Sequence, residues 1–498
     1  MPRASGEKQY NTFTKGLITE ANPLTYPENS FLDGDNIVLN RDGGIVRRLG
    51  IDYEDGYSLV ATTLTGATVS FHSWEFAGGS SEVSLGVVRV RDRLYFMDMT
   101  SAAPSSNLKN GGNYITLAGL SNARIETTVI NNNLVVVGSE LNYPIYLEYN
   151  PTTDVVSQSA ISIKVRDFWG VDDGLTLKET PSTLSDEHNY NLQNQGWIAQ
   201  IAFVKLRSGK YPSNSDMYHY GKFEDSWSYP YFSNNREALA QAPKGHFILD
   251  IYNRGTSRTT ETGLTLDNDG ELGRISTATT YSGRVFYAGV ASEVVGGDKY
   301  SPNYSGYVFF TKTVGTKEDL SICYQEADPT SADISDIIAT DGGTLAIPEA
   351  NRIVRLAAVG NSLIIFSENG VWEVYGTSDS GFKATEYSLR KITNIGVRNP
   401  DSVVVAGDSI FYWAKSGIFM LSTEQVSGRL QAQNISLATI QTFYDTLPAV
   451  SRENAKGFYD QKENKVRWLY DTENEDSTEC NTTSVVEIAI IDCAIVDN

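Results

Sequence analysis

The sequence between Arg352 and Ser422 contains the same pattern twice. The first copy reads IVRLAAV (353–359), SLIIFS (362–367) and VWEVYG (371–376), and the second reads DSVVVA (401–406), SIFYWA (409–414) and IFMLS (418–422). Each copy consists of three short runs rich in β-branched and aromatic residues, which favour strands. Because only a few residues separate the runs, each copy is predicted to form an antiparallel meander.

The turns between these runs combine glycine with asparagine or aspartate. Gly360-Asn361 and Gly407-Asp408 suit type II′ hairpin turns, whereas Asn369-Gly370 suits a type I′ turn, which needs positive φ at both central residues. Gly360 and Gly407 are 47 residues apart, a spacing typical of one blade of a β-propeller. We therefore predict a mainly β protein built on a β-propeller of antiparallel meander blades.

The whole chain can be divided into predicted domains according to where strand-like runs occur. At 498 residues it is long enough for several domains or one large repeat fold. Residues 1–56 are predicted to form a docking segment with a hairpin, and 57–159 the first blades. Residues 160–282 interrupt the strand pattern for too long to be an ordinary loop, which predicts an inserted mixed domain that contacts neighbouring proteins. Residues 283–498 carry the remaining blades and an acidic C-terminal segment.

Two further expectations concern these regions. The insertion is predicted to contain a helix capped by Ser182 or Thr183, with Asp186 and Glu187 in its first turn. The residues after Tyr470 carry acids but no lysine or arginine, and they provide one more strand without completing a meander. This pattern indicates a truncated or divergent C-terminal end.

Composition restricts the class of protein. The formal net charge is −21, which argues against tight nucleic-acid binding through a basic surface. It does not argue against a surface that DNA slides past without adhering. No run of 18 uncharged apolar residues occurs, so no membrane-spanning segment is expected, and the N-terminus lacks the apolar region of a secretory signal.

The sequence predicts no catalytic residue, metal site or cofactor. It contains no GxSxG, HExxH or P-loop motif. The histidines His188, His219 and His246 lie in polar or turn contexts and are interpreted as structural. A glycosidase would need two carboxylates about 5–10 Å apart, but among 61 acidic residues the existence of such a pair indicates nothing.

Two motif fragments and the cysteines are also interpreted structurally. The stretch 367–372, SENGVW, resembles the Asp-box of sialidase-like propellers with its acid out of place, and is predicted to be a plain hairpin. The stretch 267–271, DNDGE, lacks the later Glu of a calcium loop and is predicted to be a solvated turn. Cys323, Cys480 and Cys493 are expected to be isolated thiols, with a Cys480–Cys493 disulfide as the alternative.

The N-terminal region has a distinctive order of residues. A short run, Lys15-Gly16-Leu17, is followed by Pro23 and Pro27, which prevent a continuous helix or a central strand. A predicted hairpin then turns at residues 41–44, RDGG, and ends in the basic pair Arg47-Arg48.

This N-terminal order resembles the signature of the tail nozzle (tail tubular protein B) family of short-tailed bacteriophages. The similarity to that family extends loosely over most of the chain and is strongest at residues 11–53 and 345–422; it also includes fragments at 243–255 and 283–289. The sequence departs from the pattern at Leu17, where glycine is common, and at residues 19–22, which replace a Gln-rich element. The matching residues are Lys15, Gly16, Leu17, Ile18, Pro23, Tyr26, Pro27, Asn36, Gly44, Arg47 and Arg48.

The resemblance implies a structural virion protein of the phage tail, assembled in the host cytoplasm. It implies a homo-oligomeric ring, expected to be a hexamer, that lies below a tail adaptor, contacts tail fibres and lets double-stranded DNA pass without specific binding. The interface is expected at Lys15, Gly16, Leu17, Pro23, Tyr26, Pro27, Arg47 and Arg48. The alternative for Arg47 and Arg48 is that they are two solvated strand residues.

Two other functions stay open. The chain could be a propeller glycosidase or depolymerase that acts on host surface sugars, or a tail protein that binds glycans through its Tyr-rich insertion. A persistent monomer would favour either of these over a ring subunit.

Overall fold

The computed structural model describes two compact units, considered separately below. One contains residues 1–55, 366–373 and 390–498, and the other contains 56–365 and 374–389. The described residues are 12–22, 24, 26–33, 37–39, 43–47, 68–78, 81–101, 108–169, 245–250, 257–259, 265–267, 275–290, 305–324, 338–376, 381–424, 429–462, 464–471 and 488–494.

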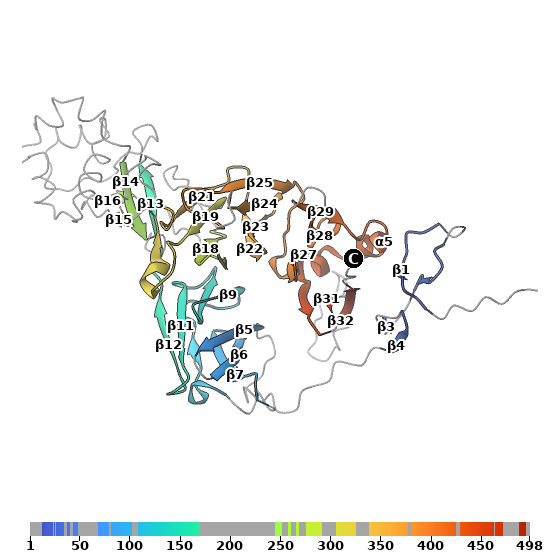
Figure 1. Ribbon diagram of the computed structural model, residues 1–498, viewed down its shortest axis with the longest axis horizontal. Helices are drawn as coiled ribbons and strands as arrows, with labels where there is room; N and C mark the ends of the chain where they lie inside the picture. Colours follow the sequence, from blue (N-terminus) through green and yellow to red (C-terminus); the bar gives the residue numbers. More distant parts are fainter. Residues whose placement is uncertain are drawn as a thin grey trace, which may run out of the picture. The chain divides into compact units, whose positions relative to one another are not determined.

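The second unit is built from meander sheets whose strands follow the order of the chain (Figure 1). The first sheet contains β5 (Val69–Gly78), β6 (Ser81–Val90), β7 (Arg93–Asp98) and β8 (Ile115–Thr116). The second contains β9 (Ile125–Ile130), β10 (Asn133–Gly138), β11 (Ile145–Asn150) and β12 (Val155–Ala160). The third contains β17 (Thr277–Tyr281), β18 (Arg284–Ala288), β19 (Tyr307–Phe310) and β21 (Gly343–Ala346).

The repeated stretch forms the next two sheets. The fourth sheet contains β22 (Ile353–Val359), β23 (Ser362–Ser367), β24 (Gly370–Tyr375) and β25 (Ser388–Thr393), with residues in both units. The fifth, in the first unit, contains β26 (Val404–Ala406), β27 (Ser409–Ala414), β28 (Gly417–Thr423) and β29 (Leu430–Asn434). The short helices α5 (Gln441–Thr446) and α6 (Ala449–Asn454) precede a three-stranded sheet of β30 (Lys456–Asp460), β31 (Lys465–Asp471) and β32 (Ile488–Ala494).

The predicted fold class is confirmed: the chain is mainly β, with a β-propeller-like fold of four-stranded antiparallel sheets. The three runs of each copy are strands, but the sequence did not reveal the fourth strand of either sheet. These strands, β25 and β29, read SLRKIT and LQAQN and consist mostly of half-buried or exposed residues. An outer strand needs little apolar surface, so it lacks the pattern by which inner strands are recognised.

The turn prediction is correct at two positions and wrong at the third. Gly360 and Gly407 have positive φ values of 53° and 58°, as the first residue of a type II′ turn requires. Asn369 and Gly370 are not among the residues with positive φ, so the predicted type I′ turn does not form there. The Ser367 hydroxyl instead donates to the Asn369 side-chain oxygen at 2.7 Å, which fixes this turn through its side chains. This agrees with a structural role for the stretch 367–372.

The first strands of consecutive sheets lie beside one another in the second unit, as in adjacent propeller blades. Between β9 and β17, the Thr128 hydroxyl accepts from the Thr280 amide at 2.9 Å. Between β17 and β22, the Thr277 hydroxyl accepts from the Leu356 amide at 2.9 Å. Threonine side chains therefore link the first strands of three successive sheets.

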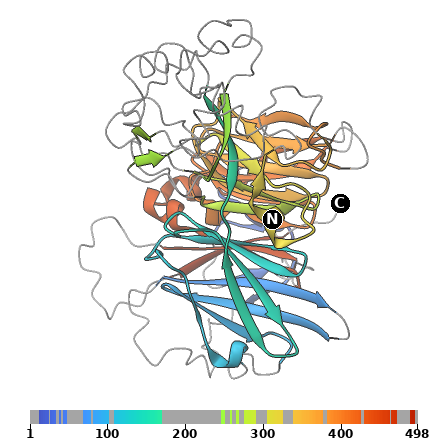
Figure 2. The ribbon, with the colours of Figure 1, turned by 90° about the vertical axis from the view of Figure 1, so that its left-hand side faces the viewer.

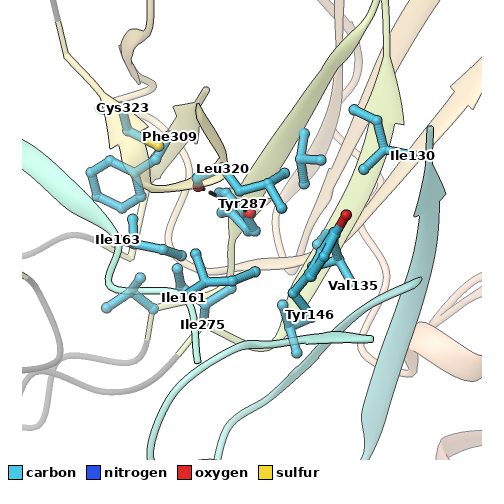
Figure 3. Packing of buried hydrophobic residues seen from close by; sticks show 14 residues of the cluster. Ile130, Val135, Tyr146, Ile161, Ile163, Ile275, Tyr287, Phe309, Leu320 and Cys323 are labelled. Atoms are coloured by element: carbon cyan, nitrogen blue, oxygen red, sulfur yellow. Dashed lines mark hydrogen bonds between the residues drawn. The ribbon is translucent and has the colours of Figure 1, made fainter. Parts of the chain in front are cut away.

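Apolar clusters fill the space between successive sheets. Trp74, Leu85 and Phe96 of the first sheet pack with Leu134 and Leu147 of the second. Figure 3 shows the next cluster, in which Ile130, Val135 and Tyr146 of the second sheet meet Tyr287 and Phe309 of the third. In the first unit, a further cluster joins the fifth sheet, helix α5 and the three-stranded sheet.

Cys323 belongs to the cluster in Figure 3 and is a buried free thiol. Burial raises its pKa far above the usual range because the thiolate would lose its hydration. The expectation of an unpaired thiol is therefore confirmed for Cys323. Cys480 and the side chain of Cys493 lie outside the described residues, so their pairing stays a prediction.

Part of the predicted insertion is described. Strands β13 (Lys164–Trp169) and β14 (Gly245–Asp250) are antiparallel, with Trp169 opposite Gly245, and β20 (Ile322–Cys323) pairs with β13. β15 (Ser257–Thr259) and β16 (Thr265–Asp267) form a separate hairpin. The predicted helix near Ser182 and Thr183, residues His188 and His219, the side chain of His246 and residues 268–271 lie outside the described parts.

Figure 2 shows the sheets of the second unit as ribbons. Buried arginines bind the connections within and between these sheets. Arg284 of β18 is 1% exposed, and its guanidinium donates to the carbonyls of Thr311 at 2.7 Å, Thr340 at 3.2 Å and Asp341 at 2.5 Å. Burial lowers its pKa to about 10, although the carboxylate of Asp341 opposes that change. Arg89 of β6 is also buried and donates to Arg91 at 2.6 Å and Ala123 at 2.5 Å.

Replacing Arg284 should strongly lower the free energy of unfolding of the second unit. In Arg284→Ala the buried carbonyls lose their donor, so the free energy of unfolding should fall by about 3 kcal/mol. Denaturant unfolding followed by tryptophan fluorescence would measure this loss. The control is Arg93→Ala, an exposed arginine of β7 whose removal should change stability by less than about 0.5 kcal/mol. Equal unfolding midpoints for the two variants would contradict the assignment.

Candidate functional site in the N-terminal segment

The described residues between 12 and 47, here called the N-terminal module, form two small sheets. β1 (Gly16–Leu17) and β2 (Ser30–Phe31) are parallel, with Gly16 opposite Ser30. β3 (Ile37–Leu39) and β4 (Ile45–Arg47) form the predicted antiparallel hairpin, with Ile37 opposite Arg47. The described residues of this segment contain no continuous helix, as the prolines in its sequence predict.

Side-chain and backbone hydrogen bonds hold the loop between β1 and β2. The Tyr26 hydroxyl donates to the Ile18 carbonyl at 2.9 Å, and the Lys15 amide donates to the Asn29 carbonyl at 3.0 Å. The Ser30 hydroxyl donates to the Pro27 carbonyl at 2.5 Å. These bonds fix Tyr26 and Pro27 in this loop and join Lys15, which precedes β1, to the end of the loop at Asn29.

A glycine allows the two small sheets to meet. The Phe13 amide donates to the Gly43 carbonyl at 2.8 Å, and the rings of Phe13 and Phe31 pack edge to face with centroids 6.0 Å apart. Gly43 has a φ of 79°, and a Cβ there would lie 2.7 Å from the Thr14 methyl group. Only glycine satisfies both constraints without strain, which explains the glycine after the hairpin turn.

The structure places the predicted interface residues on two elements. Lys15 is exposed in the loop before β1, and Gly16, Leu17, Tyr26 and Pro27 are half-buried around it. Arg47 is exposed at the end of β4. Pro23 and Arg48 lie outside the described residues. The structure therefore places five of the eight predicted residues in or beside β1 and the loop that follows it, and Arg47 on the hairpin.

The N-terminal module binds a distant part of the same unit at Thr439–Thr442. The Thr19 amide donates to the Thr439 carbonyl at 2.7 Å. The Glu20 carboxylate accepts the Thr442 amide at 2.5 Å and the Thr442 hydroxyl at 3.0 Å. Thr442 lies in the first turn of α5, whose own N-cap, Ile440, makes no side-chain hydrogen bond. Glu20 thus caps this helix from a position 422 residues away.

The electrostatics of Glu20 follow from this contact. Hydrogen bonds from the backbone and side chain of Thr442 lower the pKa of Glu20, because they stabilise its charged form. Sequence reasoning missed the contact, since Thr19 and Glu20 are residues where the chain departs from the family pattern. The only local signal for it is that α5 begins without a capping side chain of its own.

The N-terminal module also exposes apolar side chains that the sequence did not single out. Leu24 is 92% exposed and Leu32 is 61% exposed, and both lie in or beside the loop that joins β1 to β2. Ile45 and Val46 of the hairpin are 38% and 43% exposed. Four exposed large apolar residues within so short a segment are typical of a surface that another protein covers.

The described residues contain no group of three or more His, Cys, Asp and Glu side chains arranged to hold a metal ion. Their helices are also too short or too polar to cross a membrane.

No protein-family model and no curated protein matches this sequence. Solved structures with a similar backbone include a protein from Bacteroides uniformis that is provisionally assigned as a 6-phosphogluconolactonase. The alignment has 7% identity and a TM-score of 0.34, and covers 86% of this chain and 97% of that one. An ancestral GH74 enzyme aligns with 9% identity and a TM-score of 0.25, over 84% of this chain and 49% of that one. At these values neither protein's activity is transferred to this chain.

The contact between Glu20 and Thr442 should depend on pH. Because the folded-state pKa lies below the ordinary value of 4.5, the contact is at full strength above about pH 4.5 and weakens as the pH falls through the folded-state value. Amide hydrogen exchange at Gln441–Thr446, corrected for the intrinsic effect of pH, should therefore accelerate below pH 4.5.

The variant Glu20→Gln isolates the contribution of the charge. It should accelerate exchange of the Thr442 amide at neutral pH and remove most of its extra acid sensitivity. Asp33→Asn is the matched control, because Asp33 is an exposed acid of the same N-terminal module. Identical exchange at Thr442 in the wild type and both variants would refute the capping role of Glu20.

Proposed function

We propose that this chain is a structural subunit of the tail nozzle of a short-tailed bacteriophage. Six copies form a ring in the virion, below a tail adaptor, and the ring extends the channel through which DNA leaves. Tail fibres contact its outer side, and the subunit is assembled in the host cytoplasm. In this proposal the chain carries out no catalysis and needs no cofactor.

The N-terminal module is the observation that carries this proposal. The residues that resemble the nozzle family lie largely in one small folded element, and that element exposes Leu24, Leu32, Ile45 and Val46 to solvent. Apolar exposure of this kind favours permanent contact with another protein. The basic side chains Lys15 and Arg47 lie at its surface, where they suit an acidic partner.

The charge of the chain fits passage of DNA. A net charge of −21 repels phosphate groups, so DNA keeps its counterions and finds few sites at which to stall. This repulsion acts over a Debye length of about 8 Å at physiological salt. It would therefore be felt by DNA that passes close to the wall of a channel.

The proposal predicts the state of assembly. Light scattering and negative-stain imaging of the full chain, alone and with the tail adaptor of the same phage, should show a ring of about six subunits with an axial hole. In a Leu24→Asp/Leu32→Asp double variant, ring formation or adaptor binding should weaken at least tenfold, because two charges would be buried in the contact. Ile338→Asp serves as the control, since Ile338 is 54% exposed in the other unit.

A chain that remains monomeric with and without the adaptor would refute the proposal. The enzymatic alternative is addressed by a sugar-release assay on host envelope. The nozzle assignment predicts no release above that of heat-denatured protein, whereas reproducible release would support a depolymerase.

A further inference from the structure

The first sheet of the second unit has two apolar faces. The face with Trp74, Leu85 and Phe96 packs on the second sheet. The pairing of β5 with β6 and of β6 with β7 places a different set of side chains on the opposite face. That face, here called the outer face, contains Val69, Phe71 and Glu75 of β5, Gly86, Val88 and Val90 of β6, and Arg93, Tyr95 and Met97 of β7.

The outer face is continuous and partly open to solvent. Phe71 and Met99 lie over Gly86, where a Cβ would be 3.0 Å from the Phe71 ring and 2.7 Å from the Met99 sulfur. Phe71 is 55% exposed and Met99 is 40% exposed. Beneath them Val88, Val90, Tyr95 and Met97 form a buried cluster with Leu108.

An aromatic and basic margin bounds this surface along β7. The rings of Tyr95 and Tyr114 have centroids 5.6 Å apart, and the Arg93 guanidinium lies 4.3 Å from the centre of the Tyr114 ring. Glu75 lies at the other margin, on β5, and is exposed. The outer face therefore has an apolar centre, with a cation on one margin and a carboxylate on the other.

A closed ring requires two different surfaces on each subunit. In a cyclic assembly larger than a dimer, every contact joins one surface of a subunit to a non-identical surface of the next. Among the described residues, the exposed large apolar side chains include two groups, the outer face and the N-terminal module. Most other exposed large apolar residues stand singly on other elements, as is ordinary for a protein surface.

The charges of the two surfaces are complementary in one orientation. On β4, Ile45 and Arg47 point to the same side of the hairpin because they are two residues apart. If Ile45 packs on Phe71, Arg47 can approach Glu75 and stay away from Arg93 on the opposite margin. The reversed orientation would place Arg47 near Arg93, which like-charge repulsion disfavours.

We propose that the hairpin β3–β4 of one copy binds to the outer face of the first sheet in a neighbouring copy. This inference rests on the proposed ring and names the contact that closes it. Ile45 and Phe71 form the apolar centre of the contact, and Arg47 pairs with Glu75 of the neighbouring copy.

Cross-linking between two singly substituted chains tests this contact. The background is the full-length chain with Cys480→Ser and Cys493→Ser, in which Cys323 stays buried. Ile37→Cys is made in one preparation and Ser73→Cys in another, because Ile37 lies opposite Arg47 on the hairpin and Ser73 lies between Phe71 and Glu75 on the outer face. The two preparations are mixed and treated with a short bismaleimide. The control mixture pairs Ile37→Cys with Val155→Cys, since Val155 is 49% exposed on β12 of the second sheet.

The expected result is a covalent dimer in the Ile37→Cys and Ser73→Cys mixture, at least tenfold above the control mixture and above either preparation alone. A chain with both substitutions should give a ladder of products up to the full ring. Rings that form in the microscope without this cross-link would overturn the proposed contact and leave the nozzle assignment standing. A chain that does not self-associate at all would overturn both.

Charge reversal provides a second readout. Arg47→Glu should weaken self-association at least tenfold, and combining it with Glu75→Arg should restore much of the loss. If Arg47→Glu self-associated as strongly as the wild type, the pairing of Arg47 with Glu75 would be contradicted.

Discussion

Buried backbone carbonyls must be hydrogen bonded, and this requirement shapes the connections in this protein. Strands satisfy one another within a sheet, but the chain that leaves a sheet has no such partners. Arg89 and Arg284 supply the missing donors, each with several N–H groups directed at carbonyls in the connections. The Glu140 carboxylate complements Arg89 by accepting the amides of Ser121, Asn122 and Ala123 in the same connection.

Side chains also bind backbone carbonyls of a connection in the first unit. The Asn399 side chain donates to the Ala455 carbonyl, and the Ser402 carbonyl accepts from the indole of Trp468 at 2.9 Å. The 3₁₀ turn at Pro400–Ser402 is thereby bonded to the three-stranded sheet that follows it. In both units, side chains on the connections hold successive sheets together, while apolar side chains fill the space between them.

Much of the sheet architecture was predictable because inner strands are rich in β-branched and aromatic residues. The stretch SIFYWA could be identified as a strand from composition alone, and all but its first residue are buried. The outer strands β25 and β29 could not, because half-exposed positions accept polar residues. The turn at Asn369 was predicted wrongly for a different reason. The hydrogen bond from the Ser367 hydroxyl to the Asn369 side chain, and not the Asn-Gly pair, fixes its geometry.

The candidate site was predictable to a lesser degree. A sequence pattern located the segment, and the structure shows that Lys15 lies just before β1, while Tyr26 and Pro27 lie in the loop after it. The bond between Glu20 and Thr442 depends on residues hundreds of positions apart, so no local pattern could reveal it. The exposure of Leu24 and Leu32 was equally hidden, because leucines in a loop are as often buried as exposed.

The pairing of Trp169 with Gly245 has a consequence for how this protein can change. Directly opposed residues of antiparallel strands have Cα atoms about 5 Å apart, so the intervening residues leave and rejoin the sheet at nearly one point. The entropy of closing such a segment grows only with the logarithm of its length. The segment between these strands could therefore be lengthened, shortened or exchanged without disturbing the register of the strands at its two ends.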